Sequence, residues 1–306
     1  MKKCLIISNP YSGHSSSEKF KDEIMSIVSK HNYIPIFIST EYPKHAMEIA
    51  KTVEGVDLLL SIGGDGTLHE VTCGNISRSN SLTQAHIPTG TTNDVGKMYG
   101  LNNDVLSSAE KVMNGREKDV DFFKINEEPF VYVAGMGQFL HIPYITTKES
   151  KDKYGHAAYL KGGLDAWKEG TKLYNFDYEI DGKKYNTDGS IIVVTNTTRI
   201  AGFNGAYKSD FAKLNDGLFE VGIVQISNKL KLLRGAAQFI LKDATKVNGA
   251  KVIQTDNIKI HFNDKLLHNP CVDGEEYKST TDDYEFKKAK KVKMLLPKDN
   301  LNKLFK

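Results

Sequence analysis

The chain has 306 residues, of which 40% are hydrophobic and 26% charged, and its formal net charge is +3. This composition is ordinary for a globular protein, and the length favours two domains because single cores stop growing near about 250 residues. The cysteines Cys4, Cys73 and Cys271 are far apart and form no CxxC pair, which argues against a zinc site or a disulfide framework and favours a reducing, cytoplasmic compartment. No apolar run approaches the roughly 18 residues that span a bilayer, so we expect any membrane contact to be peripheral.

The first part of the chain alternates short apolar runs with segments of helical periodicity. Strands that alternate with helices imply right-handed crossovers and a parallel sheet. We expect the first helix to begin at serine caps. The predicted strands are residues 4–8, 33–39, 57–62 and 83–87, and the predicted helices are residues 15–30, 44–51 and 103–114.

After about Val120 the pattern changes to short strand-like runs between Gly, Asn and Asp turns. The dipeptide Asp181-Gly182 predicts a tight hairpin, and one clear helix is expected at residues 229–247. The predicted strands are residues 130–134, 176–180, 184–186, 191–195, 218–224, 258–262 and 292–296. We therefore predict an α/β domain at residues 1–124 and a mainly antiparallel β domain at residues 125–294, with residues 295–306 returning to the first domain.

A glycine-rich segment, GGDGT at residues 63–67, follows a strongly apolar strand and precedes a helix. Glycine allows a ligand to approach the backbone closely, and a helix N-terminus presents unpaired N–H groups with a partial positive charge. The spacing fits neither a Rossmann GxGxxG nor a Walker A motif. Glycines at such a turn can be purely architectural, but the embedded Asp65 and Thr67 favour a nucleotide-phosphate loop at the carboxyl edge of the sheet.

Two more loops follow predicted strands at the same edge. They are NPYSG at residues 9–13 and PTGTTND at residues 88–94. Each is a weak signal alone, because Asn-Pro and Thr-Gly also form ordinary turns. Three such loops at one edge of a sheet favour a common site.

The segments NPYSG, GGDGT and GTTND resemble the three signature loops of the diacylglycerol kinase catalytic family, which includes soluble bacterial lipid kinases and sphingosine kinases. The resemblance continues through residues 151–159, 214–219 and 272–275, so it covers essentially the whole chain. GGDGT alone is shared with NAD kinases and phosphofructokinase-like enzymes, whereas the NPxSG opening and the DGE segment favour lipid kinases. The chain departs from the bacterial pattern at residues 201–205 and before Asp216, which leaves the acceptor lipid open.

The resemblance implies an NAD kinase-like α/β domain followed by a β-sandwich. It implies a kinase that transfers the γ-phosphate of ATP to a lipid hydroxyl, with diacylglycerol as the favoured acceptor and Mg²⁺ as cofactor, a metal that suits oxygen ligands. The expected nucleotide-binding residues are Asn9, Pro10, Ser12, Gly13, Thr40, Gly63, Gly64, Gly66, Thr67, Glu70, Gly90, Thr91, Asn93 and Asp94.

Phosphoryl transfer needs charge neutralisation around the phosphates and a base for the acceptor hydroxyl. Asp65 is the expected essential carboxylate. Asp273 and Glu275 are two residues apart, so a strand would place both on one face. The residues alone favour a plain hairpin turn there, whereas the resemblance gives the pair a catalytic role. Which of the three carboxylates is the general base stays open.

The resemblance also implies a second, structural Mg²⁺ at Asp216, with the backbone carbonyls of Lys213 and Leu218. Lys151 is a candidate phosphate contact, although a solvated loop is the better interpretation of its surroundings. The histidines show no HxxxH or HExxH spacing, which argues against metal binding through imidazole.

Contact with a lipid surface could involve two basic segments. The helix at residues 229–247 either lies in a membrane interface or covers a β-sheet, and the second interpretation is favoured. Residues 287–306 hold eight lysines against Asp299, which predicts either a solvated face or a patch for anionic lipid. The basic residues lack interleaved aromatics, so no nucleic-acid partner is expected.

Two other functions remain open on the residues. One is an NAD kinase-like phosphotransferase, and the other is a nucleotide-binding regulatory protein without turnover. The resemblance further implies a homodimer that meets its lipid substrate at the membrane surface.

Overall fold

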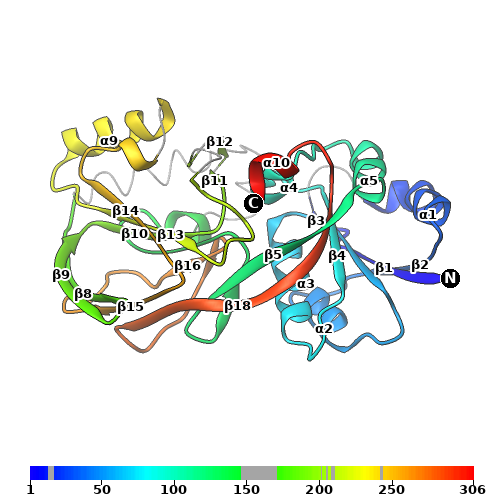
Figure 1. The fold of residues 1–306 in the computed structure, drawn as a ribbon, viewed down its shortest axis with the longest axis horizontal. Helices are drawn as coiled ribbons and strands as arrows, with labels where there is room; N and C mark the ends of the chain where they lie inside the picture. Colours follow the sequence, from blue (N-terminus) through cyan, green and yellow to red (C-terminus); the bar gives the residue numbers. More distant parts are fainter. Residues whose placement is uncertain (13–16, 146–170, 201, 205, 208–210, 242–243) are drawn as a thin grey trace. The chain divides into compact units, whose positions relative to one another are not determined.

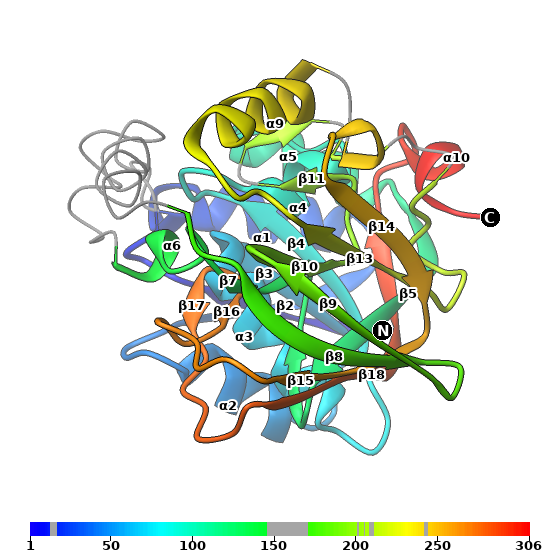
Figure 2. The ribbon, with the colours of Figure 1, turned by 90° about the vertical axis from the view of Figure 1, so that its left-hand side faces the viewer.

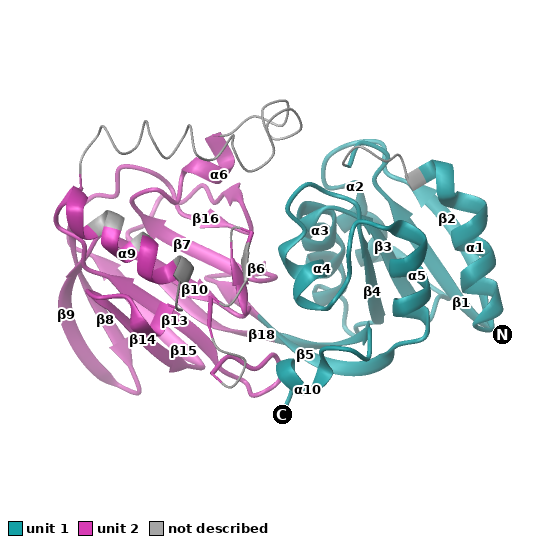
Figure 3. Cartoon of the chain, turned by 90° about the horizontal axis from the view of Figure 1, so that it is seen from above, with its two compact units in different colours: residues 1–122, 290–306 teal, residues 123–289 magenta. Residues whose placement is uncertain are grey.

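The computed structural model describes residues 1–12, 17–145, 171–200, 202–204, 206–207, 211–241 and 244–306 (Figure 1). The predictions for Gly13 and Lys151 lie outside these residues, as do residues 151–159 and part of the segment 201–205. The chain divides into two compact units. Unit 1 comprises residues 1–122 and 290–306, and unit 2 comprises residues 123–289 (Figure 3).

Unit 1 is built on a parallel sheet with the strand order β2-β1-β3-β4-β18. The strands are β1 (Lys2–Ser8), β2 (Tyr33–Ser39), β3 (Leu58–Gly63), β4 (Thr83–Pro88), β5 (Arg116–Ile125) and β18 (Asp283–Leu296), and the last two continue into unit 2. The helices are η1 (Ser17–Phe20), α1 (Lys21–Lys30), α2 (His45–Thr52), α3 (Asp65–Ile76), α4 (Asp94–Met98), α5 (Val105–Met113) and α10 (Leu301–Leu304).

Local sequence explains most of these elements. Every residue of β3 is buried, as expected for a central parallel strand covered on both faces. Helix α5 begins at Asp104, whose carboxylate accepts a hydrogen bond from the N–H of Ser107. The first helix was predicted from residue 15, but α1 begins at Lys21 after the 3-10 turn η1, and its N-cap residue, Phe20, makes no side-chain cap. Ser15 and Ser16 lie outside the described residues, so the serine cap stays a prediction.

Unit 2 contains two sheets that share one core. An antiparallel sheet has the order β14-β13-β10-β7-β16-β17, and a second group of strands comprises β5, β6, β8, β9, β15 and the first part of β18. The strands not yet given are β6 (Glu128–Phe130), β7 (Val133–Gly137), β8 (Tyr174–Ile180), β9 (Lys183–Gly189), β10 (Ile191–Thr195), β13 (Phe219–Val224), β14 (Ala250–Thr255), β15 (Asn257–Phe262), β16 (Cys271–Val272) and β17 (Glu275–Glu276).

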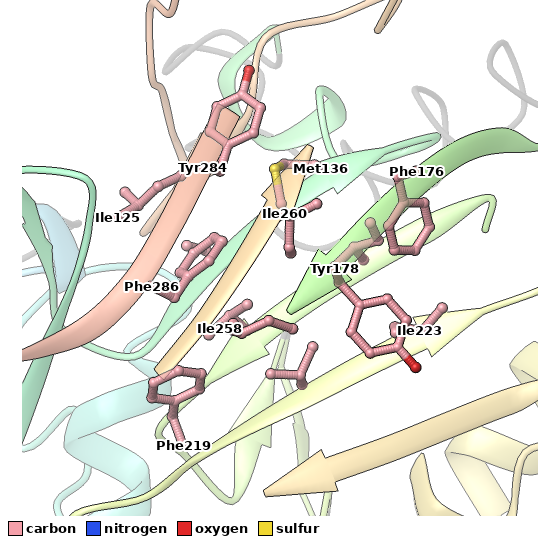
Figure 4. Close-up of a cluster of buried hydrophobic side chains, with 14 of the residues drawn as sticks. Ile125, Met136, Phe176, Tyr178, Phe219, Ile223, Ile258, Ile260, Tyr284 and Phe286 are labelled. Carbon is pink, nitrogen blue, oxygen red and sulfur yellow. The ribbon is translucent and has the colours of Figure 1, made fainter. Parts of the chain in front are cut away.

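The core of unit 2 takes alternate side chains from both sheets. Phe219 and Ile223 of the antiparallel sheet meet Ile258, Ile260 and Phe286 of the other group of strands (Figure 4). This is the packing of a β-sandwich, in which each sheet contributes one face. The predicted fold class, an α/β domain followed by an antiparallel β-sandwich, is therefore confirmed.

The outer face of the antiparallel sheet is covered as well. The remaining elements of unit 2 are α6 (Ile142–Ile145), β11 (Arg199–Ile200), β12 (Phe203–Asn204), α9 (Lys229–Leu241) and η2 (Ala244–Lys246). Helix α9 lies over the sheet near β14 (Figure 2), where Phe239 packs in a cluster with Val252 and Tyr207. The helix predicted at residues 229–247 is described from Lys229 to Leu241, and Ala244–Lys246 forms the 3-10 turn η2. Among the described residues, we find no helix both long and apolar enough to cross a bilayer.

In unit 2, one predicted turn was correct and one predicted strand was wrong. Asp181 and Gly182 have φ angles of 52° and 72° and join β8 to β9, as the dipeptide predicted. The strand predicted at residues 130–134 is instead two strands, β6 and β7, interrupted at Val131 and Tyr132.

Candidate active site

Three loops of unit 1 leave the same edge of the parallel sheet. The N–H of Asn9 donates to the carbonyl of Ile62 over 2.9 Å, which extends the β1–β3 pairing by one residue. The N–H of Thr89 likewise donates to the carbonyl of Gly63 over 2.8 Å. The strands therefore hold the loops after β1, β3 and β4 in register with one another.

Side chains then tie these loops together. Asn9 Nδ2 donates to Thr67 Oγ1 in the first turn of α3 over 3.2 Å. Ser12 Oγ and Thr89 Oγ1 share a hydrogen bond of 2.6 Å. These contacts join the loop after β1 to the loops after β3 and β4.

Glycines are required where the loops after β3 and β4 touch. A Cβ on Gly90 would lie 2.7 Å from Gly64 Cα and 2.9 Å from Asn93 Oδ1, distances that real Cβ atoms do not show. A Cβ on Gly63 would collide with the side chain of Thr67. Gly66 differs, because it is exposed and a Cβ there would meet no atom within 4 Å. The first turn of α3 is therefore open to a ligand at Gly66.

Asp65 joins two helix N-termini. It begins α3, and its carboxylate accepts hydrogen bonds from the N–H groups of Asp94 and Val95, over 3.2 and 3.4 Å, at the start of α4. Asn93 precedes α4 with φ at 52°, and its side chain bonds to both backbone groups of Gly90 over 2.9 and 2.6 Å. The partial positive charge at helix N-termini favours a carboxylate in this position.

The remaining predicted nucleotide contacts lie around this edge. Thr40 directly follows β2 and is buried, and its N–H donates to the carbonyl of Ser8 over 2.8 Å. Pro10 and Thr91 are half-buried. Glu70 accepts a hydrogen bond of 2.9 Å from the N–H of Lys44, so it holds the entry to α2. The structure brings the described members of the predicted set to one edge of unit 1.

A buried polar pair below the loops was missed by the sequence analysis. Ser61 Oγ of β3 and His86 Nδ1 of β4 are 2.9 Å apart, and both residues are buried. Burial lowers the pKa of His86 to about 3, so the imidazole is neutral. The available signal was a serine in the otherwise apolar strand β3 and a histidine between Ala85 and Ile87 of β4.

Unit 2 carries the DGE segment, and its two carboxylates have different surroundings. Asp273 is buried with φ at 49°, and its oxygens accept hydrogen bonds from the N–H groups of Val131, Tyr132 and Val133 over 2.6, 3.0 and 3.0 Å. Glu275, in β17, is exposed, and its side chain has no hydrogen bond or ion pair among the described residues. The expectation that both would share one face was wrong, because Asp273 and Gly274 form a turn with positive φ instead of extended strand.

The predicted second metal site is a tight turn of unit 2. Asp216 Oδ1 accepts a hydrogen bond from the N–H of Leu218 over 3.0 Å, and Gly217 has φ at 82°. Four residues further along, burial raises the pKa of Glu220 to about 8, and the charge of Asp216 acts in the same direction. No group of three or more His, Cys, Asp or Glu residues in the described part of the chain is arranged to hold a metal ion.

Comparison with known proteins identifies the family. Residues 3–125 match the model of the diacylglycerol kinase catalytic domain, and residues 145–287 match the YegS C-terminal NAD kinase beta sandwich-like domain. A diacylglycerol kinase of Staphylococcus aureus (strain MRSA252) is 30% identical over 233 residues, which is 76% of this chain and 73% of that protein. The chain belongs to the diacylglycerol kinase family. The predicted family is thus confirmed, and so is the predicted activity of an ATP-dependent lipid kinase.

Other members of the diacylglycerol kinase family match over greater lengths. A diacylglycerol kinase of Bacillus subtilis (strain 168) is 28% identical over 280 residues, or 90% of each chain. The crystal structure of a diacylglycerol kinase from Bacillus anthracis str. Sterne gives a TM-score of 0.79 at 21% identity and covers 98% of this chain and 99% of its own. At that identity the structural likeness bears on the fold alone.

Proposed function

We propose that this chain transfers the γ-phosphoryl group of ATP to the hydroxyl of diacylglycerol and so forms phosphatidate. The observation that carries the proposal is the meeting of three loops at one sheet edge, with Gly64 packed on Gly90 and the first turn of α3 open at Gly66. Two relatives named diacylglycerol kinase, from S. aureus and B. subtilis, support the acceptor.

The phosphates of ATP would lie against the first turn of α3. Its unpaired N–H groups and partial positive charge bind anionic oxygens well. Asn9 and Ser12 act through the loops that they tie together, whereas Thr40 and Thr91 are the proposed side-chain contacts to the nucleotide. Glu70 would support the site from outside by fixing the entry to α2.

Magnesium is the metal that fits the oxygen groups of the chain. The Asp65 carboxylate lies at the N-terminus of α4, where it accepts a hydrogen bond from the N–H of Asp94, and hard oxygen donors with retained water suit Mg²⁺. Magnesium bound with ATP would neutralise charge on the phosphate oxygens. A second, structural Mg²⁺ would be held by the Asp216 carboxylate with the carbonyls of Lys213 and Leu218.

We assign the general base to Glu275 and a positioning role to Asp273. Both oxygens of Asp273 already accept backbone N–H groups, so this carboxylate is committed to holding residues 131–133. Glu275 is exposed and can accept a proton from the acceptor hydroxyl. Asp273 would then fix the turn from which Glu275 projects.

The deciding experiment is transfer of γ-³²P from ATP, with Mg²⁺, into a panel of lipid alcohols in mixed micelles. We expect labelled phosphatidate from the wild type and none from Asp65→Ala. Glu275→Gln should lower kcat by about 10²–10⁴-fold with little change in the KM for ATP, which is the effect of removing a general base. Glu276→Gln is the matched control, since Glu276 accepts a hydrogen bond of 2.8 Å from Asn269 and should keep near wild-type activity.

Other outcomes would overturn specific parts of the proposal. An ATP-binding protein that labels no lipid would favour the regulatory alternative, and formation of NADP⁺ from NAD⁺ would favour an NAD kinase-like phosphotransferase. If Asp273→Asn lowers kcat as much as Glu275→Gln does and keeps its thermal stability, Asp273 is more than a positioning residue. That result would contradict the assignment of the general base to Glu275. The homodimer rests on the family resemblance, and sedimentation equilibrium of the full chain would test it.

A further inference from the structure

Glu220 is a buried carboxylate whose hydrogen bonding is incomplete. Its exposed fraction is 1%. Oε1 accepts a hydrogen bond of 3.1 Å from Gln254 Nε2, whereas Oε2 has no hydrogen-bond partner among the described residues. Burying a carboxylate oxygen without a partner is costly, so natural proteins seldom keep one without a compensating charge or ligand.

The strand register places a second unpaired oxygen beside Glu220. Thr195 of β10 pairs with Glu220 of β13, which pairs in turn with Gln254 of β14. Thr195 is fully buried, and its Oγ1 makes no hydrogen bond of good geometry in the described structure, although the buried Tyr207 hydroxyl lies close to it. The three side chains are neighbours on one face of the sheet, opposite to Phe219 and Val221, which belong to the sandwich core.

This face adjoins the turn at Asp216. The turn leads directly into β13, and the Asp216 carboxylate lies within electrostatic range of Glu220. Lys288 approaches the same turn, with Nζ 3.7 Å from the position of a Cβ on Gly217, but no described cation reaches Glu220 Oε2. Asp216 and Glu220 are thus four residues apart, one in the turn and one in the strand that follows it, and their charges interact.

We propose that Glu220 belongs to the divalent-cation site of Asp216, where Oε2 binds the cation or one of its water molecules. The inference rests on the second Mg²⁺ site proposed above and adds a residue to it. Magnesium keeps several of its waters in protein sites, and such waters need acceptors in the surrounding shell. Glu220 Oε2 and Thr195 Oγ1 are oxygens of this kind, and a bound cation would supply the charge that the buried carboxylate lacks.

The test is titration of nucleotide-free protein with Mn²⁺, followed by electron paramagnetic resonance, with Mg²⁺ as competitor. The Glu220→Gln variant keeps the shape and the Gln254 contact but removes the charge. We expect it to bind Mn²⁺ about 10–100-fold more weakly than the wild type, as loss of an outer ligand does at other metal sites. Asp216→Asn should lose binding as well. Glu179→Gln on β8 makes the same chemical change in the other sheet and should bind like the wild type.

Thermal unfolding gives an independent readout that also checks folding. Added Mg²⁺ should raise the melting temperature of the wild type above its value in EDTA, whereas Glu220→Gln should gain little. Should Glu220→Gln not fold, Glu220→Asp, which withdraws the carboxylate by one methylene, should also weaken Mn²⁺ binding.

Equal Mn²⁺ affinity in wild type and Glu220→Gln would overturn the proposal and leave Glu220 as a protonated acid in the core. Absence of Mn²⁺ binding to the nucleotide-free wild type would overturn it too. Neither result would affect transfer of label from ATP to diacylglycerol, so failure of this site and failure of the proposed function are distinguishable.

Discussion

At the scale of single residues, environment separates side chains that the sequence treats alike. Asp273 and Glu275 are both acids in one short motif, yet one is buried against three backbone N–H groups and the other is exposed. The N–H donors lie about 140 positions earlier in the chain, so no local pattern could reveal them. The motif could therefore be predicted as important, but the division of roles could not.

The buried His86 predicts a specific response to acid. The unfolded chain binds a proton on this histidine near its ordinary pKa of about 6.5, whereas the folded protein does so only near pH 3. Stability is therefore fully present above about pH 6.5 and falls as the pH drops toward 3, by about 1.4 kcal/mol per pH unit from this group. We expect His86→Asn, which can keep the bond to Ser61, to show a smaller loss in urea unfolding between pH 7 and pH 5.

A histidine on the surface provides the comparison. His261 has a side chain that is 51% exposed and pairs with Asp283 over 2.8 Å. The His261→Asn variant makes the same substitution at an exposed site, so it shows how much of the effect follows from replacing any histidine. If His86→Asn and the wild type lose stability in parallel, the acid sensitivity arises elsewhere in the molecule.

At the scale of elements, the sequence predicted which helices and strands are present more reliably than where each one begins and ends. Alternation of apolar runs with helical segments identified β1 to β4 and α2, α3 and α5, because burial on both faces leaves a continuous apolar signal. The strand predicted at residues 130–134 failed, since Asp273 takes the N–H groups of Val131 and Tyr132 away from the sheet. A tertiary contact there overrode local propensity.

The glycine loops give a prediction that separates packing from ligand binding. Gly90→Ala should lower the free energy of unfolding, because its Cβ would press on the Gly64 backbone and on the Asn93 side chain. Gly66→Ala should keep or raise stability by up to about 1 kcal/mol, since alanine favours helix and nothing lies within 4 Å. The same Gly66→Ala change should weaken ATP binding, because the added methyl group faces the open first turn of α3.

Calorimetric titration with ATP beside urea unfolding would check both substitutions. If Gly66→Ala binds ATP as tightly as the wild type, the phosphates do not lie against the first turn of α3. Gly90→Ala without loss of stability would show that the contact between the two loops can relax.

At the scale of the whole molecule, the fold class and the family could be predicted because their signals are local. Strand and helix periodicity gave the two architectures, and three short loops gave the resemblance to diacylglycerol kinases. The state of individual charges could not be predicted. Within the lysine-rich segment, Lys290 donates to the carbonyls of Arg78 and Ser79 over 2.6 and 3.0 Å, and Lys291 lies 3.7 Å from the buried Asp121.

These internal partners bear on how the chain would meet a lipid surface. Lys287 pairs with Glu285, and Lys293 lies 3.8 Å from Glu117. Exposed pairs of this kind are weak and screened by salt, but they reduce the positive charge available to a membrane. We therefore expect the peripheral contact to be weak, with more protein sedimenting with anionic than with neutral vesicles at low salt and little difference at high salt.

Charge reversal near the C-terminus tests where that attraction originates. Each lysine close to an anionic surface contributes about 1 kcal/mol, so the double variant Lys298→Glu and Lys303→Glu should lose most of the preference for anionic vesicles. Lys183→Glu with Lys184→Glu makes the same change in net charge on the exposed strand β9 and should retain the preference. Equal sedimentation of the wild type with both kinds of vesicle at low salt would rule out an electrostatic contact. An equal loss in both double variants would instead assign the attraction to net charge, not to the C-terminal lysines.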